Sequence, residues 1–159
     1  MIILGIDPGT ATTGYGIIKQ NDKRKGEFEI LDFGVVTTKK TDSDAQRLAV
    51  LAEDLLAILK KFKPNRAGVE KLFFATNQKT AMTVAQARGV ALLVCEQKAV
   101  PIREFTPLQV KSTLCGYGKA DKRQVQFMVQ QTFRLKRLPK PDDAADALAI
   151  ALCAGLAKI

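Results

Sequence analysis

The stretch GIDPGTATTGYG, residues 5–16, decides the fold because it places an acidic side chain where a buried strand ends. The apolar residues 2–4 lead directly into it, and such a short apolar run predicts a strand inside a sheet. Glycines and threonines follow Asp7 and predict a turn, after which residues 13–20 predict a second strand. We therefore expect a carboxylate at one end of the sheet, beside the turn that joins its first two strands.

Two classes of protein combine a strand-end aspartate with a turn of this kind. Actin-like ATPases hold ATP phosphates with an Asp-x-Gly-Thr loop, whereas nucleases of the ribonuclease H type bind Mg²⁺ with the aspartate. An actin-like ATPase clamps its nucleotide between two large domains, and 159 residues are enough for only one well-packed domain. Length therefore favours the nuclease class, with a single domain over residues 1–159.

Composition and charge predict a soluble protein that binds a polyanion. Hydrophobic residues make up 47% and charged residues 26%, the balance of an ordinary globular protein. We expect a cytoplasmic protein with no membrane association, because the chain lacks a long apolar run and a signal-peptide pattern. Lys and Arg number 25 against 16 acids, and a net charge of +9 favours nucleic acid first and an acidic membrane surface second.

Cysteine chemistry is disfavoured. The three cysteines, Cys95, Cys115 and Cys153, are widely spaced, and the chain contains no histidine. A zinc site or a Cys/His catalytic pair is therefore nearly excluded. We expect the three side chains to behave as small buried hydrophobic groups.

Hydrophobic periodicity predicts an α/β fold with the element order βββαβαβααα. Three strands joined by short turns predict an antiparallel meander, and later strands that follow helices are expected to pair in parallel. The predicted strands cover residues 2–7, 13–20, 28–38, 66–70 and 100–105, and the predicted helices cover 44–63, 77–97, 106–116, 119–133 and 141–157. This order predicts a ribonuclease H-like, five-stranded mixed sheet flanked by helices, although a fold alone does not fix the chemistry.

Four carboxylates fall where the predicted elements end or begin. Asp7 and Glu70 end two strands, and the carboxyl ends of parallel neighbours lie at one edge of a sheet. Asp143 and Asp146 are three residues apart near the start of the last helix and therefore share a helical face. Asp142 or Asp143 also has a simpler interpretation as a helix cap, which does not extend to Asp146. Because close carboxylates repel one another unless cations separate them, the set predicts a site for Mg²⁺ or Mn²⁺.

Four segments together resemble the RuvC-type Holliday junction endonucleases, in the right order and over nearly the whole chain. They are GIDPGTATTGYGII (5–18), VEKLFFATNQKTAMTVAQARGV (69–90), TPLQVKSTLCGYGKADKRQVQFMV (106–129) and DDAADALAIAL (142–152). The resemblance implies that the metal-binding and catalytic carboxylates are Asp7, Glu70, Asp143 and Asp146. Some family members have histidine where this chain has Asp143, and Asp142 is an adjacent acid that the three-residue spacing disfavours.

The resemblance also implies residues that contact DNA. The family uses an aromatic residue shortly after the glutamate to stack on bases at the junction centre, and Phe73, with Phe74 beside it, matches that place. Two lysines that the family needs for cleavage correspond to Lys111 and Lys122. Phe73 has an alternative interpretation as a core side chain, and Lys111 and Lys122 have one as solvated side chains on a helix.

The implied activity is hydrolysis of DNA phosphodiesters at a four-way junction during recombination and repair, with two Mg²⁺ ions per active site and Mn²⁺ as a substitute. Paired symmetric nicks would leave 5′-phosphate and 3′-hydroxyl ends. Two matched cuts require a two-fold homodimer, for which the helix over 77–97 is the candidate interface because it is rich in small residues; packing of this helix on its own sheet is the alternative.

The family also implies a partner, the RuvA–RuvB branch-migration complex. Two other functions remain open from the sequence: a related ribonuclease H-like nuclease that acts on RNA, and a catalytically silent junction-binding protein. The complete set of four acids argues against the silent protein.

Overall fold

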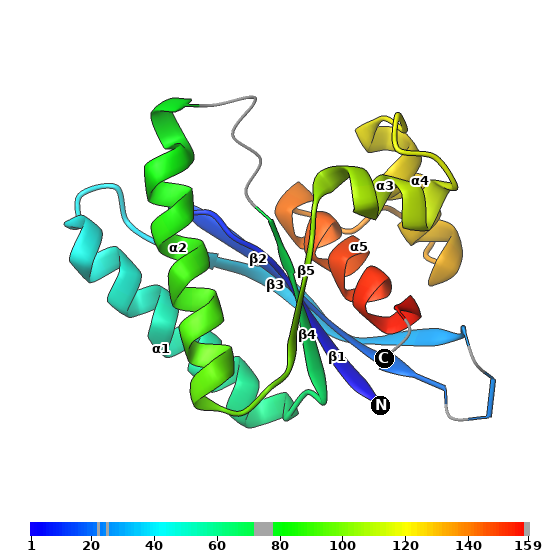
Figure 1. Ribbon diagram of the computed structural model, residues 1–159, viewed down its shortest axis with the longest axis horizontal. Helices are drawn as coiled ribbons and strands as arrows, with labels where there is room; N and C mark the ends of the chain where they lie inside the picture. The colour runs from blue at the N-terminus through cyan, green and yellow to red at the C-terminus, as the bar shows by residue number, and fades with distance from the viewer. Residues whose placement is uncertain (22, 25, 72–77, 158–159) are drawn as a thin grey trace.

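The sheet of the computed structural model has the predicted topology. The structure describes residues 1–21, 23–24, 26–71 and 78–157. Strands β1 (Ile2–Asp7), β2 (Thr12–Gln20) and β3 (Phe28–Thr37) form an antiparallel meander, and β4 (Arg66–Glu70) and β5 (Ile102–Phe105) extend it in parallel. The strand order is β3-β2-β1-β4-β5 (Figure 1). The predicted α/β fold with a five-stranded mixed sheet is confirmed.

Helices cover both faces of this sheet (Figure 1). One face carries α1 (Asp44–Phe62) and α2 (Gln78–Gln97), which share a hydrophobic core with β1 and β4. The other carries α5 (Asp142–Leu156), with α3 (Pro107–Cys115) and α4 (Lys122–Thr132) packed on it. The element order agrees with the predicted one, and β5 begins two residues late because Pro101 has no N–H for strand pairing.

Side-chain caps start three of the helices, and their absence from α5 corrects one interpretation. The capping residues of α1, α3 and α4 each accept a hydrogen bond from a backbone N–H of the helix; they are Ser43, Thr106 and Asp121. In α5 the N-cap is Pro141, which makes no side-chain cap. The interpretation of Asp142 or Asp143 as a side-chain cap is therefore wrong. Both lie inside the first turn, where the helix dipole still favours an acid.

Glycines let α5 lie directly on the sheet. A Cβ atom built on Gly14 of β2 would lie 2.0 Å from the carbonyl oxygen of Asp143, and one on Gly5 of β1 would lie 2.0 Å from that of Ala147. No side chain fits into such a contact. The approach at Gly14 fixes the first turn of α5 against the sheet, close to the end of β1.

The cysteines lie mostly in the core, as predicted. Cys95 and Cys153 are buried and Cys115 is half-buried, and all three are free thiols. Burial raises the pKa of Cys95 to about 11 and that of Cys153 to about 12, which leaves both thiols protonated and unreactive at neutral pH. Among the described helices, none combines the length and the apolar character required of a membrane span.

Candidate active site

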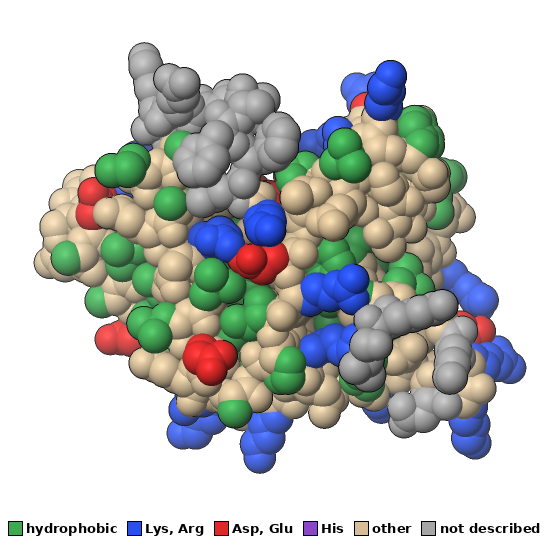
Figure 2. Space-filling view, viewed as in Figure 1, with side chains coloured by type: hydrophobic (Ala, Val, Ile, Leu, Met, Phe, Trp, Pro, Cys, Tyr) green, Lys and Arg blue, Asp and Glu red, His purple; other side chains and the backbone are tan. Residues whose placement is uncertain are grey.

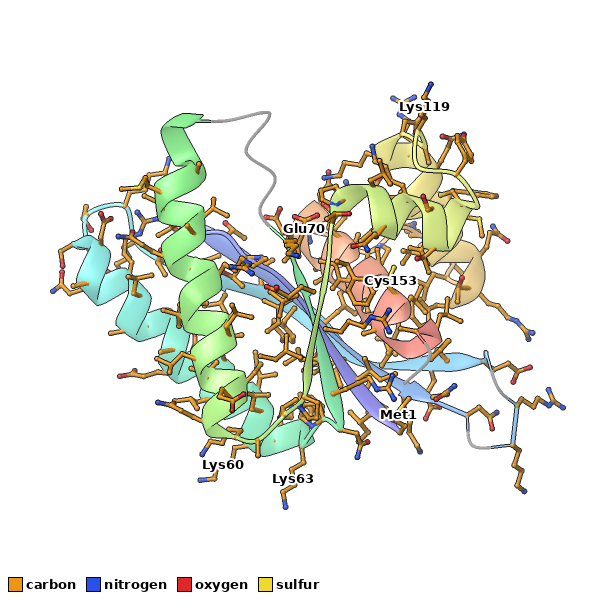
Figure 3. All side chains as sticks on the ribbon, in the orientation of Figure 1. Met1, Lys60, Lys63, Glu70, Lys119 and Cys153 are labelled. Atoms are coloured by element: carbon orange, nitrogen blue, oxygen red, sulfur yellow. The ribbon has the colours of Figure 1, made fainter. Side chains whose placement is uncertain are left out.

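Strand register brings Asp7 and Glu70 to the same edge of the sheet. The parallel strands β1 and β4 pair in register as far as Ile6 and Val69, so the next residue on each strand is an acid. Gly5 faces α5, and because side chains alternate along a strand, Asp7 faces the same way. Figure 3 shows Glu70 at the end of β4, near the first turn of α5.

The first turns of α5 add two acids to this edge. One carboxylate oxygen from each of Asp7, Asp143 and Asp146 lies within 4.8 Å of the others, a grouping that could hold a metal ion. Glu70 adjoins them, since it hydrogen-bonds to the Asp7 carboxyl and lines a pocket together with Asp146. The structure therefore brings all four predicted acids together, and their oxygen-only donor set suits a hard divalent cation.

The structure distinguishes Asp143 from its neighbour Asp142. The side chain of Asp142 lies 2.9 Å from Lys140 Nζ and 3.7 Å from Lys122 Nζ, and it is not part of the three-acid grouping. The hydrogen bond and charge of Lys140 lower the pKa of Asp142. Asp143 is therefore the acid of this pair that faces Asp7, as the three-residue spacing to Asp146 predicted.

Burial and mutual repulsion raise the pKa values of the clustered acids. For Asp7 burial is the largest cause, followed by the charges of Glu70, Asp146 and Asp143, and together they raise the pKa to about 8. Burial is also the main cause that raises the pKa values of Glu70 and Asp146. At neutral pH the metal-free cluster therefore retains a proton that a bound cation would displace.

Two lysines complete the edge of the cluster. Lys122 Nζ lies 3.0 Å from Asp146, and although burial alone would lower the pKa of Lys122, the hydrogen bond and charge of Asp146 raise it. Lys111 lines the same pocket of about 190 Å³ as Lys122, Glu70 and Asp146. Both predicted lysines thus lie at the candidate site. Phe73, with Phe74 beside it, lies outside the described residues.

The residues that hold the acids in place were not predicted from the sequence. Gly14 permits the close approach of α5, and hydroxyl groups of Thr10, Thr13 and Thr38 hydrogen-bond to backbone atoms around the turn after Asp7. The repeated threonines in TATT, residues 10–13, were the available signal. Their hydrogen bonds to the backbone account for the polar residues of this turn, which therefore need no bound phosphate to explain them.

The fold and the acidic edge define a nuclease of the ribonuclease H-like class. Residues 3–154 match the family described as "Crossover junction endodeoxyribonuclease RuvC". The chain belongs to this family and is accordingly an endodeoxyribonuclease. The protein of that description from Clostridioides difficile (strain 630) is 50% identical over 153 residues, which cover 96% of this chain and 89% of the relative.

Two solved structures from Thermus thermophilus are also similar to this chain. The first, "Thermus thermophilus RuvC structure", has 34% identity and a TM-score of 0.91. The second, "T. thermophilus RuvC in complex with Holliday junction substrate", has 31% identity and a TM-score of 0.87. Each comparison covers 98% of this chain and 94% of the other. Both the strand order and the helix arrangement are therefore those of the family.

Proposed function

We propose that this chain is a metal-dependent endonuclease of one domain that resolves four-way DNA junctions by paired symmetric nicks. The observation that carries the proposal is the convergence of acids from β1, β4 and α5 beside two lysines, in a chain of the RuvC family. A Thermus thermophilus relative was solved with a Holliday junction substrate. The net charge of +9 suits DNA, and Figure 2 shows Lys and Arg side chains along the lower edge and at the upper right of one face.

The acids Asp7, Glu70, Asp143 and Asp146 would hold two Mg²⁺ ions, and Mn²⁺ would substitute. When bound, such ions activate a water molecule and stabilise the leaving 3′ oxygen, which gives 5′-phosphate and 3′-hydroxyl ends. Asp7 is the central ligand in this proposal, because it hydrogen-bonds to Glu70 on one side and has a carboxylate oxygen within 4.8 Å of those of both α5 acids on the other. Loss of its proton would accompany metal binding.

Lys122 and Lys111 would act on the phosphate. In the metal-free protein the Lys122 ammonium group neutralises Asp146, so it already lies at the edge where the scissile phosphate would be bound. Lys111 lines the same pocket. Both cations would offset the negative charge that develops on the phosphate during in-line attack.

Replacing Lys122 with alanine is expected to lower kcat for junction cleavage by about 100-fold, with a much smaller change in junction affinity. The ammonium group would stabilise the transition state more than the bound substrate. Single-turnover cleavage at saturating enzyme, together with gel-shift titration in Ca²⁺, measures the two effects separately. Lys140→Ala is the control, because Lys140 pairs with Asp142 outside the pocket. An equal loss in affinity with unchanged kcat would make Lys122 an ordinary phosphate contact.

We further propose that the protein acts as a homodimer through α2. Two of the small residues that suggested this helix, Ala87 and Ala91, are fully buried and pack against the protein's own core. The polar side chain of Gln86 is exposed on the opposite face. The same face exposes 76% of Met82 and 56% of Leu93, with Gly89 between them. The three residues lie seven and four positions apart and share one helical face, which suits a self-complementary two-fold contact.

The Leu93→Asp variant is expected to sediment as a monomer at concentrations where the unchanged protein is a dimer. A charge in the middle of an apolar contact must be desolvated when the two copies associate. Each copy should still fold, because Leu93 is exposed within one copy. Leu108→Asp, at a 63% exposed leucine of α3, is the matched control and should remain dimeric. If Leu93→Asp stays dimeric, this face of α2 is excluded from the interface.

Cleavage of a synthetic four-way DNA junction, with and without Mg²⁺, tests the proposed function directly. Cleavage of an RNA junction but not of the DNA junction would favour the RNA-acting alternative, and tight binding without cleavage would favour a silent junction-binding protein. Family membership also motivates the RuvA–RuvB complex as a partner and the cytoplasm as the site of action.

A further inference from the structure

The turn that follows Asp7 is tied to two other parts of the chain by threonine hydroxyl groups. Thr10 Oγ1 donates a hydrogen bond of 2.6 Å to the carbonyl oxygen of Thr83 in α2. Thr38 Oγ1, just after β3, donates one of 2.6 Å to the carbonyl oxygen of Thr10. Thr10 is only 8% exposed, so water competes weakly for these bonds.

The same connection continues to α1. Arg47 of α1 donates from Nε to the hydroxyl oxygen of Thr38 at 2.9 Å, and the backbone N–H of Thr38 donates to the carbonyl oxygen of Ala11 at 3.1 Å. Hydrogen bonds thus lead from α1, through the end of β3 and the turn, to α2. Within this connection, Thr10 is the residue that joins the turn to α2.

A second threonine closes the turn internally. Thr13, which is 1% exposed, donates from Oγ1 to the carbonyl oxygen of Gly9 at 2.6 Å and accepts from the Gly9 N–H at 3.3 Å. A Cβ atom on Gly9 would lie 2.3 Å from the carbonyl oxygen of Thr12, so the compact turn requires glycine there. Thr13 therefore fixes the shape of the turn, whereas Thr10 fixes its position relative to α2.

The end of β1 needs such a restraint because its carboxylate lies among repelling charges. Asp7 is close to Asp143 and Asp146, and when all three carboxylates are ionised they repel one another unless a cation separates them. A site that receives a divalent cation works best when its ligands are already held in place by surrounding hydrogen bonds. A tie from the turn to a long helix provides that restraint without adding another group to the site.

We propose that Thr10 is a positioning residue for the metal site: its hydroxyl group holds the end of β1 against α2 and so keeps Asp7 placed to receive a divalent cation. The proposal rests on the proposed function for the identity of the metal ligands. Because the exposed face of α2 is the proposed dimer contact, the Thr10 bond also joins that helix to the metal-binding strand.

The test compares Thr10→Val, which keeps the shape and removes the donor, with Thr10→Ser, which keeps the donor. The matched control is Thr132→Val, since Thr132 likewise donates its hydroxyl to a backbone carbonyl, that of Met128, on the exposed side of α4. For each full-length protein, Mg²⁺ binding is measured by calorimetry without DNA, alongside the Mg²⁺ midpoint for junction cleavage and the thermal midpoint.

Thr10→Val is expected to weaken Mg²⁺ binding by about tenfold and to raise the Mg²⁺ midpoint for cleavage by the same factor. Thr10→Ser and Thr132→Val should both match the unchanged protein. A merely structural role would lower the thermal midpoint of Thr10→Val and leave its Mg²⁺ affinity unchanged, and that result overturns the proposal. Equal losses in Thr10→Val and Thr10→Ser overturn it as well.

If Thr10→Val does not fold, Thr38→Val removes the other hydroxyl tie to the turn. It should shift the Mg²⁺ affinity in the same direction, and an unchanged affinity overturns the proposal. Measurements on the unchanged protein distinguish a wrong positioning role for Thr10 from a wrong proposed function. If it neither binds Mg²⁺ nor cleaves the junction, both proposals fall; if it does both and Thr10→Val matches it, only the positioning role falls.

Discussion

Junction cleavage by the Asp7→Asn variant is expected to fall by about 1,000-fold or more, while the fold and junction binding persist. Asparagine keeps the shape of the side chain and removes the charge that would hold the cations, and several kcal/mol of electrostatic stabilisation corresponds to a loss of this size. Junction binding without Mg²⁺ should persist, because the raised pKa of Asp7, about 8, leaves this side chain largely protonated at neutral pH and asparagine is also neutral. Cleavage in Mg²⁺ and gel shifts without Mg²⁺ measure the two properties.

Asp142→Asn is the matched control for this experiment. Asp142 adjoins the cluster along the chain, yet it pairs with Lys140 and Lys122 and does not face Asp7. The control should therefore keep most of its cleavage activity. Substantial nicking by Asp7→Asn at ordinary Mg²⁺ concentrations would remove Asp7 from the proposed ligand set.

The same variant has a pH signature in the metal-free protein. The pKa of Asp7 is about 8 in the folded chain against an ordinary value of 3.8, so between these pH values the folded state holds a proton that the unfolded state releases. The free energy of unfolding therefore falls as pH rises from about 4 to about 8. With EDTA at pH 8.5, Asp7→Asn should melt at a higher temperature than the unchanged protein, and Mg²⁺ should narrow the difference.

The order of the elements could be predicted from the sequence because local patterns encode it. Apolar runs, turn residues and helix caps act over a few positions, and a helix that returns to the sheet predicts that the next strand runs parallel, as β4 does beside β1. The same reasoning predicts two pairs of acids, because Asp7 and Glu70 end neighbouring parallel strands and Asp143 and Asp146 share a helical face. That the two pairs meet was predicted from the family resemblance.

Contacts between distant segments could not be predicted in this way. Thr10 and Thr83 are 73 positions apart, and no periodicity connects a turn hydroxyl to a carbonyl of α2. Asp142 looked like a cap from its place in the sequence, but the helix begins after Pro141. A glycine in a strand has several explanations, and only the packing shows that Gly14 lies under the backbone of α5.

Gly14→Ala is expected to lower the free energy of unfolding by about 3 kcal/mol, because the added methyl group has no space. Its Cβ atom would lie 2.0 Å from the carbonyl oxygen of Asp143 and 2.5 Å from the carbonyl carbon. These are backbone atoms of a helix, so a rotamer change cannot relieve the contact and the first turn of α5 must move. A stability loss of this size corresponds to a fall in Tm of roughly 10 °C for a chain of this length.

The displaced turn carries Asp143, so Gly14→Ala should also impair cleavage by the molecules that remain folded. A ligand moved by about 1 Å from its working position can cost about 100-fold in rate. The measurement pairs thermal melts with cleavage assays well below the melting temperature. Gly34→Ala on β3 is the control, because the nearest atoms belong to the Tyr15 side chain, which can move away. If Gly14→Ala melts and cleaves like that control, the approach at Gly14 does not hold the acids of α5 against the end of β1.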